Sequence, residues 1–171
     1  MNASEFPELL RGLTIPGATV GPVLNEQGEP AGPGSGLEYG FTVTGQHGAR
    51  IAWQVVFQED GQLATEGPPA TYPEAVPTAP DKLVLLDVEQ SIASWIGQSA
   101  AGPHVKELAR YSATPSRRGI KYGVRVDLYN GGRVFIQALW ILAPGETYTR
   151  DNKFRMCEEV SRVCGSRRVS M

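Results

Sequence analysis

An alternation of apolar and polar residues between positions 37 and 57 constrains the fold of this chain more than any other feature of its sequence. The apolar positions are Leu37, Tyr39, Phe41 and Val43 in a first stretch, and Ile51, Trp53, Val55 and Phe57 in a second. A period of two is typical of β-strands with one buried face. The two stretches therefore predict an antiparallel hairpin whose apolar side chains share one face.

The register of this hairpin follows from its loop. A three-residue loop at 46–48 places Gly48 in the left-handed conformation that a type I turn followed by a bulge requires. The opposite pairs are then Val43/Ile51, Phe41/Trp53, Tyr39/Val55 and Leu37/Phe57. A slip of one residue would turn one strand's apolar side chains to the other face, so the matched faces support this register.

A second hairpin is predicted from residues 120–128 and 134–142. With 130–132 as its loop, the opposite pairs are Leu128/Val134, Val126/Ile136, Val124/Ala138 and Tyr122/Trp140. The later stretch also carries Phe135, Leu139 and Ile141 on its other face. Because strands that are apolar on both faces are usually covered on both faces, we expect 134–142 to be a central or covered strand.

Helical spacing of apolar residues predicts two helices that pack on this sheet. The first covers Ser4–Leu13, and the second covers Asp87–Gln98 with Asp87 as its capping residue. Lys82–Leu86, just before the second helix, is expected to be a short buried strand. Ala18–Leu24 is predicted as an edge strand, because Pro22 has no N–H to donate to a neighbouring strand.

Two further helices are expected in the later part of the chain. Pro103 suits the first turn of a short helix that runs to about Tyr111. The last predicted helix, Asn152–Cys164, has Met156 and Val160 on one side. A basic tail follows it.

Together these elements predict an α+β fold. Its antiparallel sheet is built from the two hairpins plus short strands and is covered by the central helix, with further helices near both ends of the chain. The 20 glycines and 13 prolines gather in long loops, expected at 25–36 and 58–80. We expect a single domain over 1–150, followed by the C-terminal helix and tail at 151–171.

The residues that commonly hold metals or act as nucleophiles are few. Cys157 and Cys164 are seven residues apart, too far along one helix for a disulfide, so free thiols are expected. A zinc site would need two more ligands, and the chain has only His47, expected in a turn, and His104, expected in the first turn of a short helix. The sequence therefore predicts no metal, no cofactor and no catalytic residue.

The two halves of the chain carry opposite charge. Residues 1–89 hold twelve acidic and three basic side chains, whereas residues 90–171 hold six acidic and thirteen basic ones. Three interpretations are open: the halves neutralise each other within one fold, copies of the chain associate through opposite charges, or the basic half binds nucleic acid. The candidate interaction residues on this basis are Arg117, Arg118, Lys121, Arg125 and Arg133.

The favoured function is that of a non-enzymatic, protein-binding assembly protein, with self-association expected. A structural component of a virus or phage particle, associated with the neck, tail or capsid, fits this description. A nucleic-acid-binding accessory protein is the alternative, and a small enzyme or enzyme inhibitor is a third hypothesis. No apolar run approaches the ~20 residues of a membrane span, and the first residues do not have the pattern of a signal peptide. A cytoplasmic or virion location and no membrane partner are therefore expected.

Overall fold

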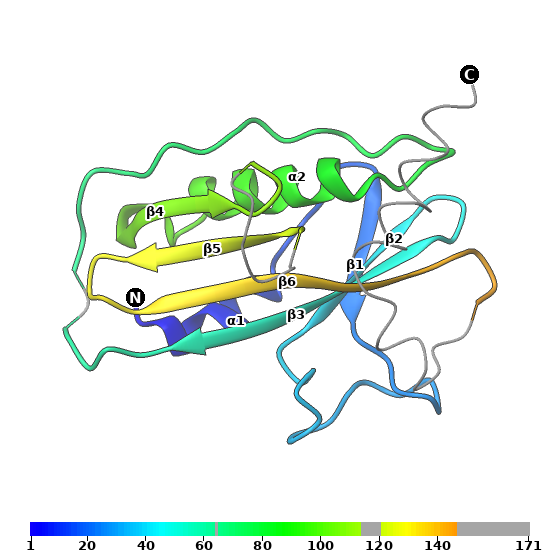
Figure 1. Cartoon of the computed structure of the whole chain (residues 1–171), viewed down its shortest axis with the longest axis horizontal. Helices are drawn as coiled ribbons and strands as arrows, with labels where there is room; N and C mark the ends of the chain where they lie inside the picture. The colour runs from blue at the N-terminus through cyan, green and yellow to red at the C-terminus, as the bar shows by residue number, and fades with distance from the viewer. Residues whose placement is uncertain (64, 114–120, 147–171) are drawn as a thin grey trace.

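The computed structural model describes residues 1–63, 65–113 and 121–146, and a six-stranded antiparallel sheet organises them (Figure 1). The strands lie in the order β1-β2-β3-β6-β5-β4. Their bounds are Ala18–Pro22 (β1), Phe41–Gly45 (β2), Arg50–Gln58 (β3), Val105–Arg110 (β4), Gly123–Leu128 (β5) and Arg133–Leu142 (β6). The helices are α1 (Phe6–Leu10) and α2 (Leu85–Gln98), with short 3₁₀ turns at Ala3–Glu5 (η1) and Gly102–His104 (η2). This is an α+β architecture.

Both α-helices pack on the same face of the sheet. Their apolar side chains, including Phe6, Leu10 and Ile92, share one buried cluster with alternate residues of the strands, such as Trp53 and Ile136. A second, smaller cluster lies on the opposite face and includes Val23, Leu37, Ala52, Trp140 and Leu142. We call this opposite side of the sheet the open face.

The pairing of β2 with β3 has the predicted register around its loop. Phe41 lies opposite Trp53 and Val43 opposite Ile51, and Gly48 has φ +95°. The prediction for the outer part of this hairpin is wrong, because β2 begins only at Phe41. Residues 37–40 form a turn closed by a hydrogen bond from the Gly40 N–H to the Leu37 carbonyl (2.9 Å), which takes Leu37 into the second cluster.

The pairing of β5 with β6 differs from the predicted register by two residues. Val124 lies opposite Ile136 and Val126 opposite Val134, so the loop is 129–131 and not 130–132. Gly131, with φ +85°, takes the left-handed position in this loop. Since a shift of two residues keeps every side chain on its face, alternation alone does not separate the two registers.

A bulge in the pairing of β3 with β6 places Trp140 on the opposite face of the sheet from the one predicted. Ala52 pairs with Trp140 and Trp53 pairs with Ala138, which leaves Leu139 as an extra residue in β6. Beyond this bulge the alternation is inverted. Trp140 therefore packs in the second cluster on the open face, and Ile141 packs in the larger cluster under the helices. As expected, β6 is central, between β3 and β5.

The region before α2 is helical earlier than predicted. Val84 is the N-cap of α2, so Leu85 and Leu86 belong to the helix, no strand forms at Lys82–Leu86, and Asp87 lies within the first turn. The apolar run that indicated a strand instead buries Leu83 and Leu85 against the core. The N-terminal helix is split into η1 and α1, and β1 is the edge strand that Pro22 indicated.

The predicted helix from Pro103 to Tyr111 is wrong. Only Gly102–His104 forms a 3₁₀ turn, and Val105–Arg110 is β4, the edge strand that pairs with β5. In so short a segment, the apolar positions Val105, Leu108 and Ala109 suit a helix or a bulged strand equally. Hydrogen bonding to β5 decides between them.

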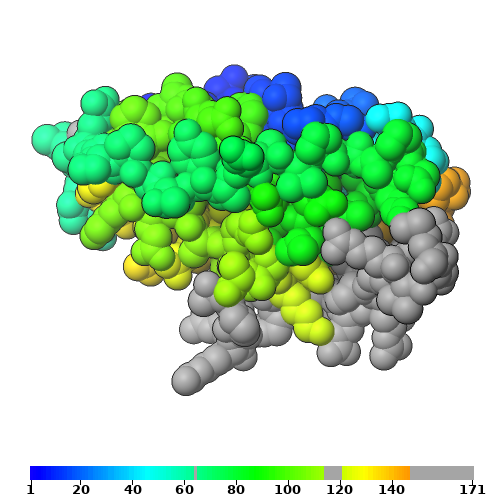
Figure 2. Space-filling model, turned by 90° about the horizontal axis from the view of Figure 1, so that it is seen from above, coloured from blue at the N-terminus to red at the C-terminus, as the bar shows by residue number. Residues whose placement is uncertain are grey.

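Residues 65–80 form an extended strap along α2, seen above the helix in Figure 1 and as teal to green atoms in Figure 2. The Ser91 hydroxyl bonds both the N–H and the carbonyl of Val76, at 3.0 and 2.9 Å. The ring of Tyr72 lies where a side chain at Gly97 would begin. The strap therefore covers the side of α2 that faces away from the sheet.

Several predictions fall outside the described residues. They concern the helix Asn152–Cys164, the thiols Cys157 and Cys164, the basic tail, and Arg117 and Arg118.

Replacing Trp53 by alanine should lower the free energy of unfolding by about 3–5 kcal/mol, because its side chain is fully buried and stacks on Phe41 at a centroid distance of 6.2 Å. Urea denaturation measures the change. Gln58→Ala, on the same strand but exposed, is the matched control and should stay within about 0.5 kcal/mol of the wild type. Equal losses in both variants would contradict the described packing.

Candidate interaction surface

The open face of β3, β6, β5 and β4 carries an apolar centre beside charged residues. Val56 of β3 and Phe135 of β6 are directly paired, and Phe135 is in turn opposite Arg125 of β5. Val56 is 45% exposed and Phe135 is half-buried. In the part of the chain that the structure describes, no helix packs on this side of the sheet.

A line of alternating charges crosses the strands next to this apolar centre. Arg125 is 3.1 Å from Glu107 and 3.1 Å from Asp127, and Arg133 is 3.0 Å from Asp127. We call Glu107, Arg125, Asp127 and Arg133 the charged ladder. It follows from the register, which places Asp127 between Glu107 and Arg133. Cross-strand pairs of opposite charge stabilise a sheet modestly.

The five predicted interaction residues are only partly brought together. Arg125 and Arg133 lie on the open face and share Asp127. Lys121 is exposed just before β5. Arg117 and Arg118 lie outside the described residues. The structure adds Glu107 and Asp127 to the two arginines, so the ladder has as many acidic as basic side chains.

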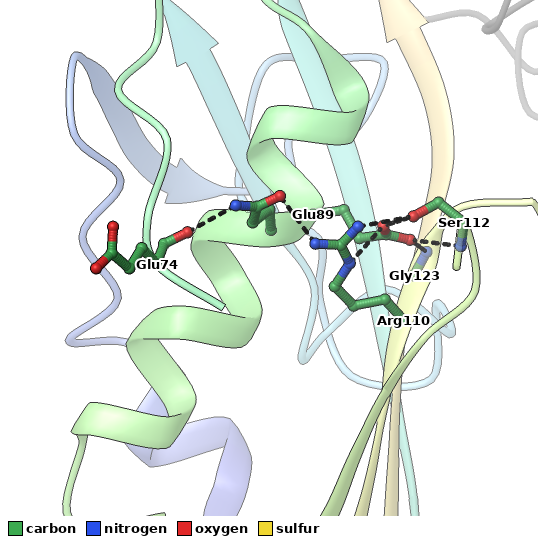
Figure 3. A network of polar contacts seen from close by, with 6 residues as sticks. Glu74, Glu89, Arg110, Ser112 and Gly123 are labelled. Atoms are coloured by element: carbon green, nitrogen blue, oxygen red, sulfur yellow. Dashed lines mark hydrogen bonds and ion pairs between the residues drawn. The ribbon is translucent and has the colours of Figure 1, made fainter. Parts of the chain in front are cut away.

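A buried carboxylate lies on the other side of the sheet, where β4 ends and β5 begins (Figure 3). Glu89 of α2 is fully buried and accepts hydrogen bonds from the Gly123 N–H (2.8 Å), the Ser112 N–H (3.2 Å) and the Ser112 hydroxyl. Its Oε2 lies 3.5 Å from Nε of Arg110. Gln90 accepts a hydrogen bond from Arg110 and donates one to the Glu74 carbonyl, which connects the network to the strap.

Burial raises the pKa of Glu89 above its ordinary value, because the ionised form loses hydration. The hydrogen bonds from Ser112 and Gly123 and the charge of Arg110 act in the opposite direction and reduce the increase. Glu89 thus joins α2 to both ends of the connection between β4 and β5. Its contacts with Ser112, Gly123 and Arg110 link the helix to the sheet.

Sequence reasoning did not identify Glu89, although a signal was present. Glu89 precedes Ile92, Ala93 and Ile96 by three, four and seven residues, so it shares the buried stripe of α2. An acidic residue in such a stripe needs a buried partner. The partner, Arg110, lies on a segment that the sequence did not place beside the helix.

Two other kinds of feature are absent from the described residues. Across the described ranges, no three or more His, Cys, Asp and Glu side chains gather as metal ligands would. No described helix is long and apolar enough to cross a membrane. Comparison with known proteins finds no matching family model, no matching curated relative and no matching solved structure.

Glu89→Gln should alter how stability depends on pH. A folded-state pKa above the unfolded value of about 4.3 means that the folded chain holds its proton more tightly, so wild-type stability falls as pH rises through this interval. Glutamine cannot ionise, so the stability of the wild type relative to the variant should decrease from about pH 4 upward. Urea denaturation of both proteins at a series of pH values from about 4 upward measures this difference in stability. A relative gain for the wild type with rising pH would contradict the assigned direction.

Proposed function

We propose that this protein is a non-enzymatic assembly protein that associates with a second copy of itself through the open face of β3, β6, β5 and β4. The observation that carries the proposal is the apolar pair of exposed Val56 and half-buried Phe135 next to the charged ladder on one sheet face. Protein interfaces combine an apolar centre with a polar surround in this way.

The charges of the ladder suit contact with an identical surface. In a two-fold dimer the same patch meets itself, so a patch must be complementary to its own image. A row that contains Glu107, Arg125, Asp127 and Arg133 offers both signs, so a two-fold rotation can bring a basic side chain of one copy near an acidic one of the other. A patch of one sign would repel its copy.

The same charges favour a protein partner over nucleic acid at this face. Phosphate binding needs an excess of basic side chains. Arg125 and Arg133 each lie within 3.1 Å of Asp127, and Arg125 also contacts Glu107. The two arginines are thus already paired with carboxylates.

Val56→Asp should weaken self-association at least tenfold, because it places a charge in the apolar centre of the contact. Sedimentation velocity over a concentration series measures the effect. Leu63→Asp is the matched control, since Leu63 is 89% exposed in the segment after β3, and it should leave the association unchanged. Phe135→Ala provides a second variant on the same patch.

Two results would contradict this proposal. The first is that the wild-type chain is a monomer at all accessible concentrations. The second is that Leu63→Asp and Val56→Asp weaken self-association equally. A monomer that retains labelled single-stranded DNA or RNA in a filter-binding titration, with affinity that falls steeply with salt, would favour the nucleic-acid alternative.

A further inference from the structure

A hollow of about 270 Å³ opens at the other end of the open face, away from the charged ladder, where β1, β2, β3 and β6 lie side by side. Two cross-strand rows line it. One runs Thr19, Thr44, Arg50, Leu142 and the other runs Gly21, Thr42, Ala52, Trp140. Gly21 and Ala52 have almost no side chain, which leaves space beside the large ring of Trp140.

The wall of the hollow is built from the residues that follow β1, in the segment that projects away from α2 in Figure 1. Oδ1 of Asn25 accepts hydrogen bonds from the N–H groups of Gln27 and Glu29, both at 2.9 Å. The Ala31 N–H donates to the Val23 carbonyl at 2.8 Å. Val23 is itself buried in the second cluster. The wall is therefore held by the protein's own contacts and is formed before any ligand binds.

The chemistry of the lining is mixed. Val23, Leu24, Trp140 and Leu142 supply apolar surface, and Arg50 is the one charged residue among the lining groups. Thr19, Thr42 and Thr44, each of which carries a hydroxyl, also line the hollow. Over residues 1–63, 65–113 and 121–146, these three hydroxyls make no hydrogen bond to the protein.

Most of the hydrogen-bond donors of Arg50 are not used by the described residues. Its guanidinium carries five N–H groups, and one hydrogen bond, to the Glu146 carbonyl, is made to the described residues. A guanidinium next to hydroxyl groups is well suited to a carboxylate, which accepts several hydrogen bonds at once. Because no acidic residue lines the hollow, an anion is favoured there over a cation.

We propose that this hollow binds a small carboxylic acid with a branched or aromatic apolar body. The carboxylate lies at Arg50 and the threonine hydroxyls, and the apolar body lies against Trp140 and Leu142. The volume is just below the range of about 300–1,000 Å³ typical of drug-sized ligands, so the ligand is small. A free acid and the C-terminal residue of a polypeptide present the same chemistry. The inference is independent of the proposed self-association, which uses other residues.

Benzoate is the probe, and benzamide is its matched neutral control. Two-dimensional NMR of the labelled full chain follows the indole N–H of Trp140 and the amides of Thr42 and Thr44 during titration. We expect saturable shifts with benzoate at these positions, and at least tenfold weaker binding of benzamide. Equal binding of the two probes, or shifts that do not saturate or that lie elsewhere, would overturn the proposal.

Two variants test separately the charge of Arg50 and the free volume of the hollow. Arg50→Gln should weaken benzoate at least tenfold and leave benzamide unchanged. Gly21→Val should abolish binding of both, because a Cβ at Gly21 meets no atom within 4 Å and points into open space. Valine is favourable in a strand, so the variant is expected to fold, and its urea midpoint checks this. Thr42→Val, which removes one hydroxyl, is a third variant and should weaken benzoate binding several-fold. Unchanged benzoate affinity in both Arg50→Gln and Gly21→Val would overturn the site.

A pair of peptides distinguishes the two sources of the carboxylate. A short peptide that ends in phenylalanine with a free carboxylate is compared with the same peptide as its C-terminal amide. Tighter binding of the free-carboxylate peptide than of benzoate supports a polypeptide C-terminus as the ligand. Binding of benzoate without binding of either peptide supports a free acid. Failure of both benzoate and the free-carboxylate peptide would overturn the proposal.

Discussion

The pairing of β3 with β6 is the interaction on which the rest of the structure depends. Each strand belongs to a different hairpin, and they pair from Arg50 opposite Leu142 to Gln58 opposite Arg133. This pairing makes one sheet from two hairpins and gives α1 and α2 a continuous apolar surface to cover. The bulge at Leu139 within it turns Trp140 to the open face, and both the second cluster and the floor of the hollow depend on that turn.

Much of this sheet was predictable from the sequence, because alternation and loop glycines are local signals. The loop at 46–48 and the opposition of Phe41 and Trp53 follow from such signals and agree with the structure. The bulge in β6 does not, since it lies in the pairing of β6 with β3, a strand of the other hairpin. The strand β4 was missed for a related reason: its six residues become a strand through hydrogen bonding to β5.

The candidate surface was predictable in part. The charge difference between the two halves of the chain drew attention to Arg125 and Arg133, and the structure places both on the open face. It does not follow from the sequence that Asp127 lies between them, since that depends on which residues face each other across β5 and β6. Glu89 shows the same limit, because its partners Ser112 and Gly123 are brought together only by the fold.

The contact between Tyr72 and Gly97 has a consequence for how this chain can change over evolution. The tyrosine ring occupies the place where any side chain at position 97 would start, and Tyr129 stands in the same relation to Gly67. A larger residue at either glycine therefore requires a smaller residue at its tyrosine. Among related sequences these positions should vary as pairs, and a glycine retained in α2 should coincide with an aromatic residue in the segment that crosses it.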